Sequence, residues 1–462
     1  MAGRDSMDLQ GANVAVIGLG ASGVAAALLA VEKGGDVYVS DTRTDDAVAA
    51  RGADLRKRGV DVELGGHDLQ RMAQATVVVA SPGIPPDAPV LRGLRARGVR
   101  WISEPELAAR FYTGSLIAVT GTNGKTTTTL LVERLLRASG IDAAAGGNVG
   151  GGLAPPAAEV ALREPQPSWV VLEMSSFQLA GVETFHPDVG VVTNLSPDHL
   201  DRYGSVDAYY ADKARLFERA DDDSVWVLPV GDPEVEALVG EASGRRYHFG
   251  LDDGEALVDG GVLTLRIFGE VEPLLPRTDF PLLGRHNVLN GLAAALTARL
   301  AGAAEGGLVA GLSSARALPH RLEPILERDG ILWVNDSKAT NVAAARSALE
   351  SLDRDVVLLL GGKDKGESFS RLAPAVRRRA RAVLVYGAVA SRAARELSRA
   401  LGGDPPSVER VEGGLERVVR RAAEVARDGD VVLLSPACSS FDMYESYEHR
   451  GRHFAALVRA ST

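Results

Sequence analysis

The chain has 462 residues, which is too long for one ordinary domain and predicts two to four. Its composition is globular, and its net charge of −10 excludes a nucleic-acid protein that binds through bulk positive charge. Cys438 is the only cysteine, which excludes an intrachain disulfide and fits a reducing compartment.

The N-terminal residues carry acids and no apolar core, so they do not resemble a secretory signal. The longest near-apolar stretches, such as Val24–Val31, are too short to cross a bilayer. We therefore expect a cytoplasmic protein without membrane insertion.

Short apolar runs alternate with amphipathic helical segments, such as Leu130–Ser139, along the whole chain. This alternation predicts βαβ units and parallel sheets, hence an α/β fold. The predicted strands are Val14–Ile17, Val37–Val39, Val77–Ala80, Leu116–Val119, Trp169–Leu172, Val189–Thr193, Val356–Leu360, Val383–Tyr386 and Val431–Leu434.

Two composition breaks predict linkers, at Tyr112–Ser115 and at Leu312–Ala317. They divide the chain into three predicted domains, residues 1–112, 113–317 and 318–462. In the middle domain, Asp259-Gly260-Gly261 separates two apolar runs and predicts an antiparallel hairpin.

The first glycine-rich loop, Gly18–Gly23, follows a strand and opens a helix, and Asp41 ends the next strand. This arrangement matches the dinucleotide fingerprint, in which backbone amides at a helix N-terminus hold a diphosphate. NAD, another nucleotide diphosphate and a plain strand–helix turn all remain open. Asp41-Thr42-Arg43 and Ser81-Pro82-Gly83 follow strands, where an open α/β sheet binds ligands.

A second glycine-rich loop, Gly121-Thr122-Asn123-Gly124-Lys125-Thr126-Thr127, lies between a strand and a helix. Its amides and the Lys125 ammonium suit the β- and γ-phosphates of ATP, and the Thr126 hydroxyl suits Mg²⁺. The spacing between its glycines is shorter than in the common P-loop. The loop predicts an ATP-using protein.

Three further residues are metal candidates. Glu173 ends an apolar strand, where a carboxylate can bind Mg²⁺ directly or through water, although an acid that stabilises a helix start is also open. His199 follows another strand and could be a local hydrogen-bonding group. Lys213 shares a helix face with Tyr209 and Leu216, and it is either a surface side chain or a desolvated, reactive amine.

Nine motifs occur in order along the chain, and together they resemble the Mur ligase family over nearly its whole length. They are TGTNGKTTT (120–128), GGNVG (146–150), EMSSFQL (173–179), TNLSPDHLDRYGS (193–205), GRHNVLN (284–290), PHRLE (319–323), NDSKATN (335–341), LGGKDKG (360–366) and LSPACSSFD (434–442).

The resemblance implies three domains: a Rossmann-like domain for the UDP part of the substrate, a P-loop ATPase domain, and a Rossmann-like domain for the amino acid. It implies that ATP activates the carboxylate of UDP-N-acetylmuramoyl-L-alanine as an acyl phosphate, which the amine of D-glutamate attacks. The expected by-products are ADP and phosphate. We expect a monomer whose partners are these small molecules.

The resemblance also implies roles for individual residues on the ATP side. Lys125, Thr126 and Thr127 would bind phosphates and one Mg²⁺, Glu173 and His199 would serve a second Mg²⁺, and Lys213 would carry a CO₂-derived carbamate as a metal ligand. Lys338 would lie near the reacting groups. The remaining ATP contacts would be Gly121, Thr122, Asn123, Gly124, Asn287, Asn290, Arg321 and Asp336.

Two further sets follow from the resemblance. The UDP substrate would meet Ala21, Ser22, Asp41, Thr42, Ser81, Pro82, Gly83, Asn148, Ser175 and His199, and D-glutamate would meet Lys365, Ser440, Phe441 and Tyr447. Lys363 competes with Lys365 for one role, and the Tyr447 hydroxyl is not expected to be essential because only an aromatic ring is called for.

Several alternatives stay open. The chain could add another amino acid, use L-glutamate, or extend folate, although folate-extending relatives lack such a first domain. An NAD-dependent oxidoreductase would explain the first glycine loop alone. A P-loop switch protein would explain the second.

Overall fold

The computed structural model describes residues 7–85, 87–199, 202–403 and 405–460. Leu200 and Asp201, which belong to the TNLSPDHLDRYGS motif, lie outside these residues. The chain divides into two compact units: Met1–Phe280 with Leu289–Ser314, and Pro281–Val288 with Ala315–Thr462. The three predicted domain ranges stay a prediction. Among the described helices, none combines the length and the apolar character needed to cross a bilayer.

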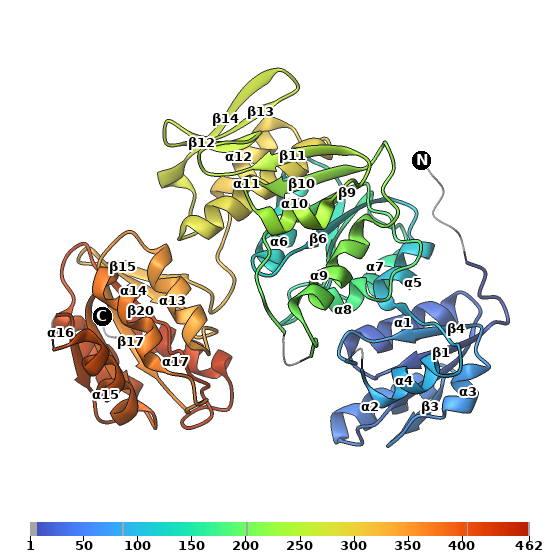
Figure 1. The fold of residues 1–462 in the computed structure, drawn as a ribbon, viewed down its shortest axis with the longest axis horizontal. Coiled ribbons are helices and arrows are strands. Elements are labelled where there is room, and N and C mark those ends of the chain that lie inside the picture. The colour runs from blue at the N-terminus through green and yellow to red at the C-terminus, as the bar shows by residue number, and fades with distance from the viewer. Residues whose placement is uncertain (1–6, 86, 200–201, 404, 461–462) are drawn as a thin grey trace. The chain divides into compact units, whose positions relative to one another are not determined.

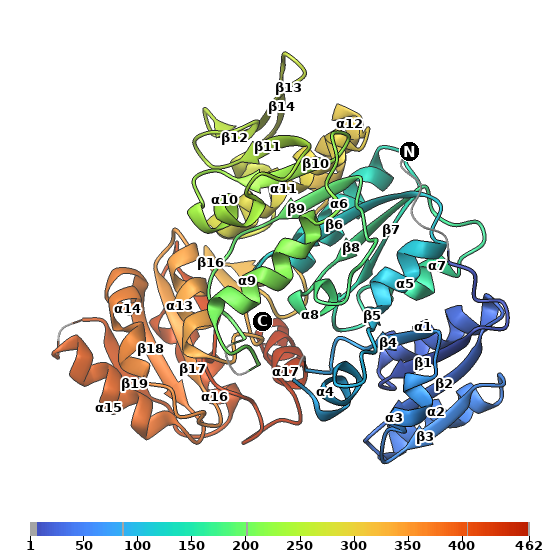
Figure 2. The same cartoon turned by 45° about the vertical axis from the view of Figure 1, so that its right-hand side comes forward.

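The first sheet is parallel and has the order β3-β2-β1-β4-β5 (Figures 1 and 2). Its strands are apolar runs buried on both faces, as a parallel sheet covered by helices requires. The elements are β1 Asn13–Ile17, α1 Ala21–Glu32, β2 Asp36–Asp41, α2 Asp46–Arg56, β3 Asp61–Leu64, α3 Leu69–Ala73, β4 Val77–Ala80, α4 Pro89–Arg95, β5 Ile102–Ser103 and α5 Glu104–Phe111.

The second sheet has the order β14-β13-β12-β11-β10-β9-β6-β8-β7. Its parallel part is β6 Ser115–Thr120, β7 Ala143–Gly147, β8 Trp169–Glu173, β9 Val189–Val192, β10 Val225–Pro229 and β11 Arg245–Phe249. The other members of the domain are α6 Lys125–Ala138, α7 Ala157–Ala161, α8 Ser176–Leu179, α9 Val206–Ala214, α10 Pro233–Val239, β12 Ala256–Asp259, β13 Val262–Ile267, β14 Glu270–Pro276, α11 Arg285–Leu300 and α12 Glu305–Ser313.

The predicted hairpin is confirmed, because β12 pairs antiparallel with β13. An additional strand, β14, pairs with β13 and forms the outer edge of the sheet (Figures 1 and 2). Two expected boundaries were wrong. The helix expected from Val206 to about Arg219 ends at Ala214 and continues only as a 3₁₀ turn, Arg215–Phe217. The expected linker at Leu312–Ala317 begins inside α12.

The third sheet has the order β15-β16-β20-β17-β18-β19, with β15 antiparallel to β16. Alternate residues of its buried strands enter two separate cores: Leu358 and Leu360 pack in one, and Val357 and Leu359 in the other. Its elements are β15 Glu323–Arg328, β16 Ile331–Asn335, α13 Val342–Ser351, β17 Val356–Gly361, α14 Ala373–Arg379, β18 Ala380–Tyr386, α15 Ala390–Leu401, β19 Ser407–Arg410, α16 Leu415–Val425, β20 Val431–Leu434 and α17 Tyr447–Ala460.

The first two sheets belong to one unit and share one hydrophobic core, which joins Val14 and Val16 to Leu116 and Ala118. All nine predicted strands are present, and the three-domain α/β architecture with mostly parallel sheets is confirmed. The topology also explains where the glycine loops lie. β1 is flanked by β2 and β4, and β6 is flanked by β8 and β9, so both loops emerge where the chain switches direction across a sheet.

Candidate active site

The P-loop follows β6 and has a backbone that only glycine adopts readily at two positions. Gly121 has φ +134° and Gly124 has φ +84°. A Cβ at Gly121 would lie 2.0 Å from Thr193 Oγ1, and one at Gly124 would lie 2.3 Å from Asn290 Oδ1. Both positions therefore require glycine, because of their φ angles and because of these close neighbours.

Side chains after β9 hold the loop in place. Thr193 Oγ1 donates to the Asn123 carbonyl at 2.6 Å, and Asn194 Nδ2 donates to the same oxygen at 2.9 Å. The Thr122 hydroxyl donates to the Ser196 carbonyl at 3.0 Å. The loop is thus organised by the start of the TNLSPDHLDRYGS motif.

Lys125 opens α6, and its ammonium folds back over the loop. Its Nζ donates to the carbonyls of Gly121 at 3.0 Å and Thr122 at 2.9 Å. These contacts keep the positive charge beside the loop amides, the position needed to meet the phosphates of a nucleotide. Thr126 and Thr127 follow in the first turn of α6 and are partly exposed.

Lys213 lies on α9, and its side chain is only 1% exposed. Its Nζ donates to the Gly121 carbonyl at 2.7 Å and lies 4.8 Å from the centre of the Tyr209 ring. Burial, reinforced by the nearby Lys125 charge, lowers the pKa of Lys213 well below its ordinary value, although Asp198 and Glu173 act in the opposite direction. The sequence left open whether Lys213 is a surface side chain or a desolvated amine, and its burial shows that the amine is desolvated.

Glu173 ends β8 beside the P-loop, and its side chain is 3% exposed. Its Oε1 accepts a hydrogen bond from Asn148 Nδ2 at 3.3 Å, and its Oε2 is buried without a hydrogen-bond partner. A buried carboxylate oxygen without a partner is costly in a folded protein. This oxygen therefore fits a cation ligand better than it fits a helix-start acid.

His199 has φ +55°, and its side chain is 45% exposed. Its ring lies 5.4 Å from that of Phe177 and 6.0 Å from that of Tyr209, measured between centroids. Within the described residues, no group of three or more His, Cys, Asp or Glu side chains is arranged to hold a metal. The proposed metal ligands include only two residues of these types, Glu173 and His199. The other two proposed ligands are Thr126 and Lys213.

The first glycine loop is fixed by Asp41. Its carboxylate accepts from the backbone N–H of Leu19 at 2.7 Å and from Arg43 Nη2 at 2.7 Å and Nε at 3.1 Å. Burial raises the pKa of Asp41, but the hydrogen bonds from Arg43 and Leu19 outweigh it and lower the pKa to about 2. The carboxylate predicted to contact uridine is thus already engaged inside the protein.

The other predicted substrate residues of this domain lie at the same sheet edge. Ala21 and Ser22 open α1, so their backbone N–H groups are at its N-terminus. Ser81 follows β4, and its hydroxyl donates to the Gly18 carbonyl at 3.4 Å. Thr42, Pro82 and Gly83 adjoin these positions. The other two predicted substrate residues belong to the second sheet, where Asn148 follows β7 and Ser175 caps α8 through its capping box with Gln178.

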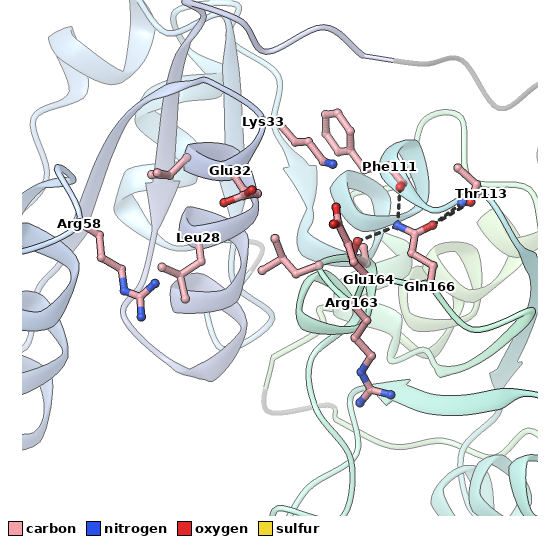
Figure 3. Close-up of a pocket in the computed structure, with 12 residues that line it drawn as sticks. Leu28, Glu32, Lys33, Arg58, Phe111, Thr113, Arg163, Glu164 and Gln166 are labelled. Carbon is pink, nitrogen blue, oxygen red and sulfur yellow. Dashed lines mark hydrogen bonds between the residues drawn. The ribbon is translucent and has the colours of Figure 1, made fainter.

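A separate pocket of about 710 Å³ opens in the same unit, between the C-terminal end of α1 and the segment after α7 (Figure 3). The Lys33 ammonium lies 5.7 Å from the centre of the Phe111 ring there, and Gln166 bonds the Phe111 carbonyl. Its lining residues lie at the end of α1 and in the segments just before β3, β6 and β8, so the pocket lies at the amino ends of the strands. Ligands in this fold bind at the carboxyl ends, so this pocket is not the candidate site.

Asn290 and Asn287, both predicted to meet adenine, lie on α11. Asn290 contacts the Thr128 hydroxyl at 3.4 Å in the first unit. Asn287 belongs to the second unit, where its Nδ2 donates to the Leu283 carbonyl at 2.8 Å.

The second unit gathers the other predicted residues at the carboxyl edge of its sheet. Asp336 follows β16 and accepts from Ser435 Oγ at 2.8 Å and from the Leu322 N–H at 3.2 Å. Burial raises its pKa to about 7, although these hydrogen bonds and Arg321 act in the opposite direction. Lys338 Nζ lies 5.5 Å from the centre of the Tyr447 ring.

The two competing lysines are placed differently. The Lys363 backbone pairs with Ser439, whereas Lys365 Nζ donates to Thr340 Oγ1 at 3.2 Å. Ser440 is buried, and Phe441 beside it is 67% exposed. The choice of Lys365 stays a prediction.

Sequence reasoning missed Arg450, a fully buried residue of α17. Its guanidinium donates to the carbonyls of Ser337 at 2.9 Å, Cys438 at 3.1 Å and Gly361 at 3.4 Å, and to Ser337 Oγ at 2.9 Å. It therefore ties together three segments that carry predicted site residues. Among the described residues no carboxylate forms an ion pair with it. In the sequence, Arg450 is one of several charged residues in an amphipathic segment, and this pattern does not predict that it is buried.

Arg450→Met is expected to lower the melting temperature and to raise the KM for the amino-acid substrate. Each buried carbonyl left without its donor costs about 1–3 kcal/mol, and the three segments lose their common anchor. Thermal unfolding and steady-state kinetics measure the two effects. Arg452→Met, on the exposed side of the same helix, is the matched control. Equal melting temperatures and KM values for the two variants would contradict the anchoring role.

Comparison with known proteins gives a consistent family. The profile described as "Mur ligase MurD-like, N-terminal domain" matches residues 12–103, "Mur ligase middle domain" matches 119–298, and "Mur ligase, glutamate ligase domain" matches 320–438. Curated relatives called UDP-N-acetylmuramoylalanine–D-glutamate ligase include one from Acidobacterium capsulatum, 41% identical over 98% of this chain and 97% of its own length. Another, from Salinibacter ruber, is 40% identical over 96% of each chain.

Solved structures share the fold at lower identity. The UDP-N-acetylmuramate–alanine ligase MurC of Thermotoga maritima is 20% identical with a TM-score of 0.58, and it covers 98% of this chain and 100% of its own. The MurF ligase of the same organism is 16% identical with a TM-score of 0.59, and it covers 98% of this chain and 97% of its own. With relatives near 40% identity along nearly its whole length, the chain belongs to the Mur ligase family.

Proposed function

We propose that the chain catalyses the ATP-dependent addition of D-glutamate to UDP-N-acetylmuramoyl-L-alanine in peptidoglycan synthesis. The observation that carries this proposal is the near-complete match to curated D-glutamate ligases, 41% identical over 98% of the chain. The P-loop with Lys125, Glu173 and Lys213 around it supports the ATP-dependent part.

The chemistry follows from the weakness of a carboxylate as an electrophile. One oxygen of the alanyl carboxylate attacks the γ-phosphorus of ATP, the bond to the β-γ bridging oxygen breaks, and ADP leaves. The amine of D-glutamate attacks the acyl carbon to give a tetrahedral intermediate and loses a proton. The intermediate collapses, and phosphate leaves with the former carboxylate oxygen. Lys125 stabilises the charge on the transferred phosphoryl group.

Mur ligases use ATP and Mg²⁺. Two Mg²⁺ ions, when bound, would offset phosphate charge at this site. Thr126 would hold one, and Glu173, His199 and a carbamate on Lys213 would hold the other. The partnerless Oε2 of Glu173 is the observation that fits a cation here.

Lys213 has the environment that carbamate formation needs. Its amine is buried and has a lowered pKa, so a lone pair is available to attack the carbon of CO₂. The nitrogen loses a proton in that reaction, and the product is an anionic oxygen ligand. Burial makes the charged ammonium form of Lys213 unfavourable. Carbamylation would replace it with an anionic group that can bind a cation.

The UDP substrate would bind along the carboxyl edges of the first two sheets. Ala21 and Ser22 would offer amides to the diphosphate, and Asp41 and Thr42 would contact the uridine. Ser81, Pro82, Gly83 and Ser175 would also contact the UDP substrate. Asn148 and His199 would meet the sugar–lactoyl–alanyl part. Asn287, Asn290, Arg321 and Asp336 would contact ATP, and Lys338 would lie near the reacting groups.

The glutamate carboxylates would be bound in a pocket formed by Lys365, Ser440, Phe441 and Tyr447. Two carboxylates need a cation and oriented donors. Ser440→Ala is expected to raise the KM for glutamate by about tenfold, the size of one lost hydrogen bond to a charged group, and to leave the KM for ATP nearly unchanged. Steady-state kinetics with each substrate varied in turn would measure both. A larger rise in the KM for ATP would contradict this pocket.

A phosphate-release assay tests the whole proposal. Release should require both UDP-N-acetylmuramoyl-L-alanine and D-glutamate, and other D- and L-amino acids, L-glutamate included, should not replace D-glutamate. Phosphate release without the UDP substrate would favour a P-loop switch protein. Tight NADH binding in a fluorescence titration would favour an oxidoreductase. Because both nucleotide substrates are cytoplasmic metabolites, we propose that the reaction takes place in the cytoplasm. We also expect the protein to be a monomer.

A further inference from the structure

Four aromatic rings form a cluster beside the P-loop, and the imidazole of His199 is one of them. The Phe177 ring contacts both His199 and Tyr203, with a distance of 5.4 Å between centroids in each case. The Tyr209 ring also contacts both, at 6.0 Å from His199 and 5.4 Å from Tyr203. The Tyr209 hydroxyl lies 3.3 Å from Thr122 Oγ1, so the cluster adjoins the P-loop. Tyr203 therefore contacts the same two rings that contact His199.

The backbone at His199 has a conformation that its surroundings must hold. Its φ of +55° lies in the left-handed region, which residues other than glycine seldom adopt. The His199 carbonyl accepts from the N–H groups of Arg202 at 2.9 Å and Tyr203 at 3.0 Å. A conformation of this kind persists only where neighbouring contacts fix it. Tyr203 supplies a backbone contact to His199 and also contacts it indirectly through the ring cluster.

Tyr203 is itself anchored to α9 by its hydroxyl. Its side chain is buried, and its O–H donates to Asp212 Oδ2 at 2.9 Å. Burial raises the pKa of Tyr203 above its ordinary value, so the hydroxyl keeps the proton that it donates. The Tyr203 ring also lies nearly parallel to that of Phe177, with an angle of 6° between the two planes. The side chain is thus held both by its ring face and by its hydroxyl.

The anchor lies next to Lys213 in the sequence. Asp212 and Lys213 are successive residues of α9, and their side chains reach different groups. Asp212 holds Tyr203, whereas Lys213 Nζ donates to the Gly121 carbonyl at 2.7 Å. One turn of α9 therefore fixes Lys213 directly and fixes the segment that carries His199 through Tyr203. His199 and Lys213 are two of the residues proposed above to serve one cation.

We propose that Tyr203, through its hydrogen bond to Asp212, is a positioning residue that holds His199 in place relative to Lys213 for binding a divalent cation. The alternative is that Tyr203 only fills space in the aromatic cluster, a role that needs its ring but not its hydroxyl. Removal of the hydroxyl alone therefore separates the two roles. This inference rests on the proposed function, because it takes His199 and Lys213 as ligands of the second Mg²⁺.

The test measures Mn²⁺ binding to the full-length protein by electron paramagnetic resonance. A non-hydrolysable ATP analogue, UDP-N-acetylmuramoyl-L-alanine and bicarbonate are present throughout. The natural chain should bind two Mn²⁺ ions, and Lys213→Ala identifies the second ion as the one whose binding is lost. Tyr203→Phe should weaken that ion by about tenfold, the size of one hydrogen bond to a charged group. The Mg²⁺ concentration for half-maximal phosphate release should rise by a similar factor.

Variants of the acceptor and a matched control complete the comparison. Asp212→Ala should weaken the second Mn²⁺ as Tyr203→Phe does, because it removes the same hydrogen bond. Asp212→Asn keeps an acceptor oxygen and should retain most of the affinity. Tyr210→Phe removes the hydroxyl of a neighbouring tyrosine on α9, whose ring lies 5.7 Å from that of Tyr209. This control should bind both ions as the natural chain does.

A double variant tests whether Tyr203 acts through His199. In a His199→Ala background, Tyr203→Phe should weaken Mn²⁺ no further, because the side chain that it positions is gone. Additive losses would overturn the inference. So would an unchanged Mn²⁺ affinity in Tyr203→Phe, and a lower melting temperature in that variant would then show a structural role only. If the natural chain binds one Mn²⁺ that neither Lys213→Ala nor His199→Ala weakens, the inference falls with the assignment of the second cation. Phosphate release that needs both substrates would still support the ligase reaction in that case.

Discussion

Lys125→Ala is expected to abolish ATP-dependent ligation and to leave binding of the UDP substrate intact. The Lys125 ammonium lies over the P-loop, fixed by the Gly121 and Thr122 carbonyls, and it is the one cation that opens α6 at the phosphate position. Removing a preorganised charge aimed at the transferred phosphoryl group costs about 10³-fold in kcat. The UDP site is built from another glycine loop, so it should not change.

The measurement is phosphate release under saturating substrates, with calorimetric binding of the UDP substrate alongside. Lys57→Ala is the matched control, because Lys57 is an exposed lysine of the same unit that pairs only with Asp54 on the surface of the first domain. Retained turnover in Lys125→Ala would refute the assignment of the loop.

Lys213→Ala should lose most of the activity, by about 10²-fold or more, because the anionic ligand proposed for the second cation disappears. Short carboxylic acids should restore part of the activity by placing a carboxylate where the carbamate would lie. Lys213→Arg should also be inactive, and it should resist rescue because its side chain fills the same buried space.

Removal of CO₂ separates carbamylation from a purely structural role of Lys213. The natural chain should lose activity in bicarbonate-free, degassed buffer and regain it when bicarbonate is added. Activity that is independent of CO₂ would count against the carbamate. Failure of every carboxylic acid to rescue Lys213→Ala, with a melting temperature equal to that of the natural chain, would do the same.

Local pattern was enough to predict much of the fold. The apolar runs at Val14–Ile17 and Val356–Leu360 are strands because their residues are apolar on both faces, which a covered parallel sheet requires. The turn at Asp259-Gly260-Gly261 predicts its hairpin for an equally local reason. Strand order could not be predicted, because it depends on pairings between residues far apart in the chain.

The candidate site was predictable only where the residues that perform one role are adjacent in the sequence. Gly121–Thr127 predicts phosphate binding because its glycines, lysine and threonines lie between a strand and a helix. The burial of Lys213 depends on the packing of α9 against the P-loop, and the clamp formed by Arg450 depends on three backbone carbonyls, which no side-chain pattern encodes. Asp41 illustrates the reverse case. Its position suggests a ligand contact, yet a neighbour two residues away, Arg43, engages its carboxylate.

The central claim is that ATP activates the substrate carboxylate for attack by an amine. The most direct test uses UDP-N-acetylmuramoyl-L-alanine with ¹⁸O in its alanyl carboxylate, together with ATP and D-glutamate, and mass analysis of the released phosphate. Acyl-phosphate formation predicts one ¹⁸O atom in each phosphate and the other in the new amide. Phosphate without ¹⁸O would show that water or another group attacks ATP, and it would contradict this account.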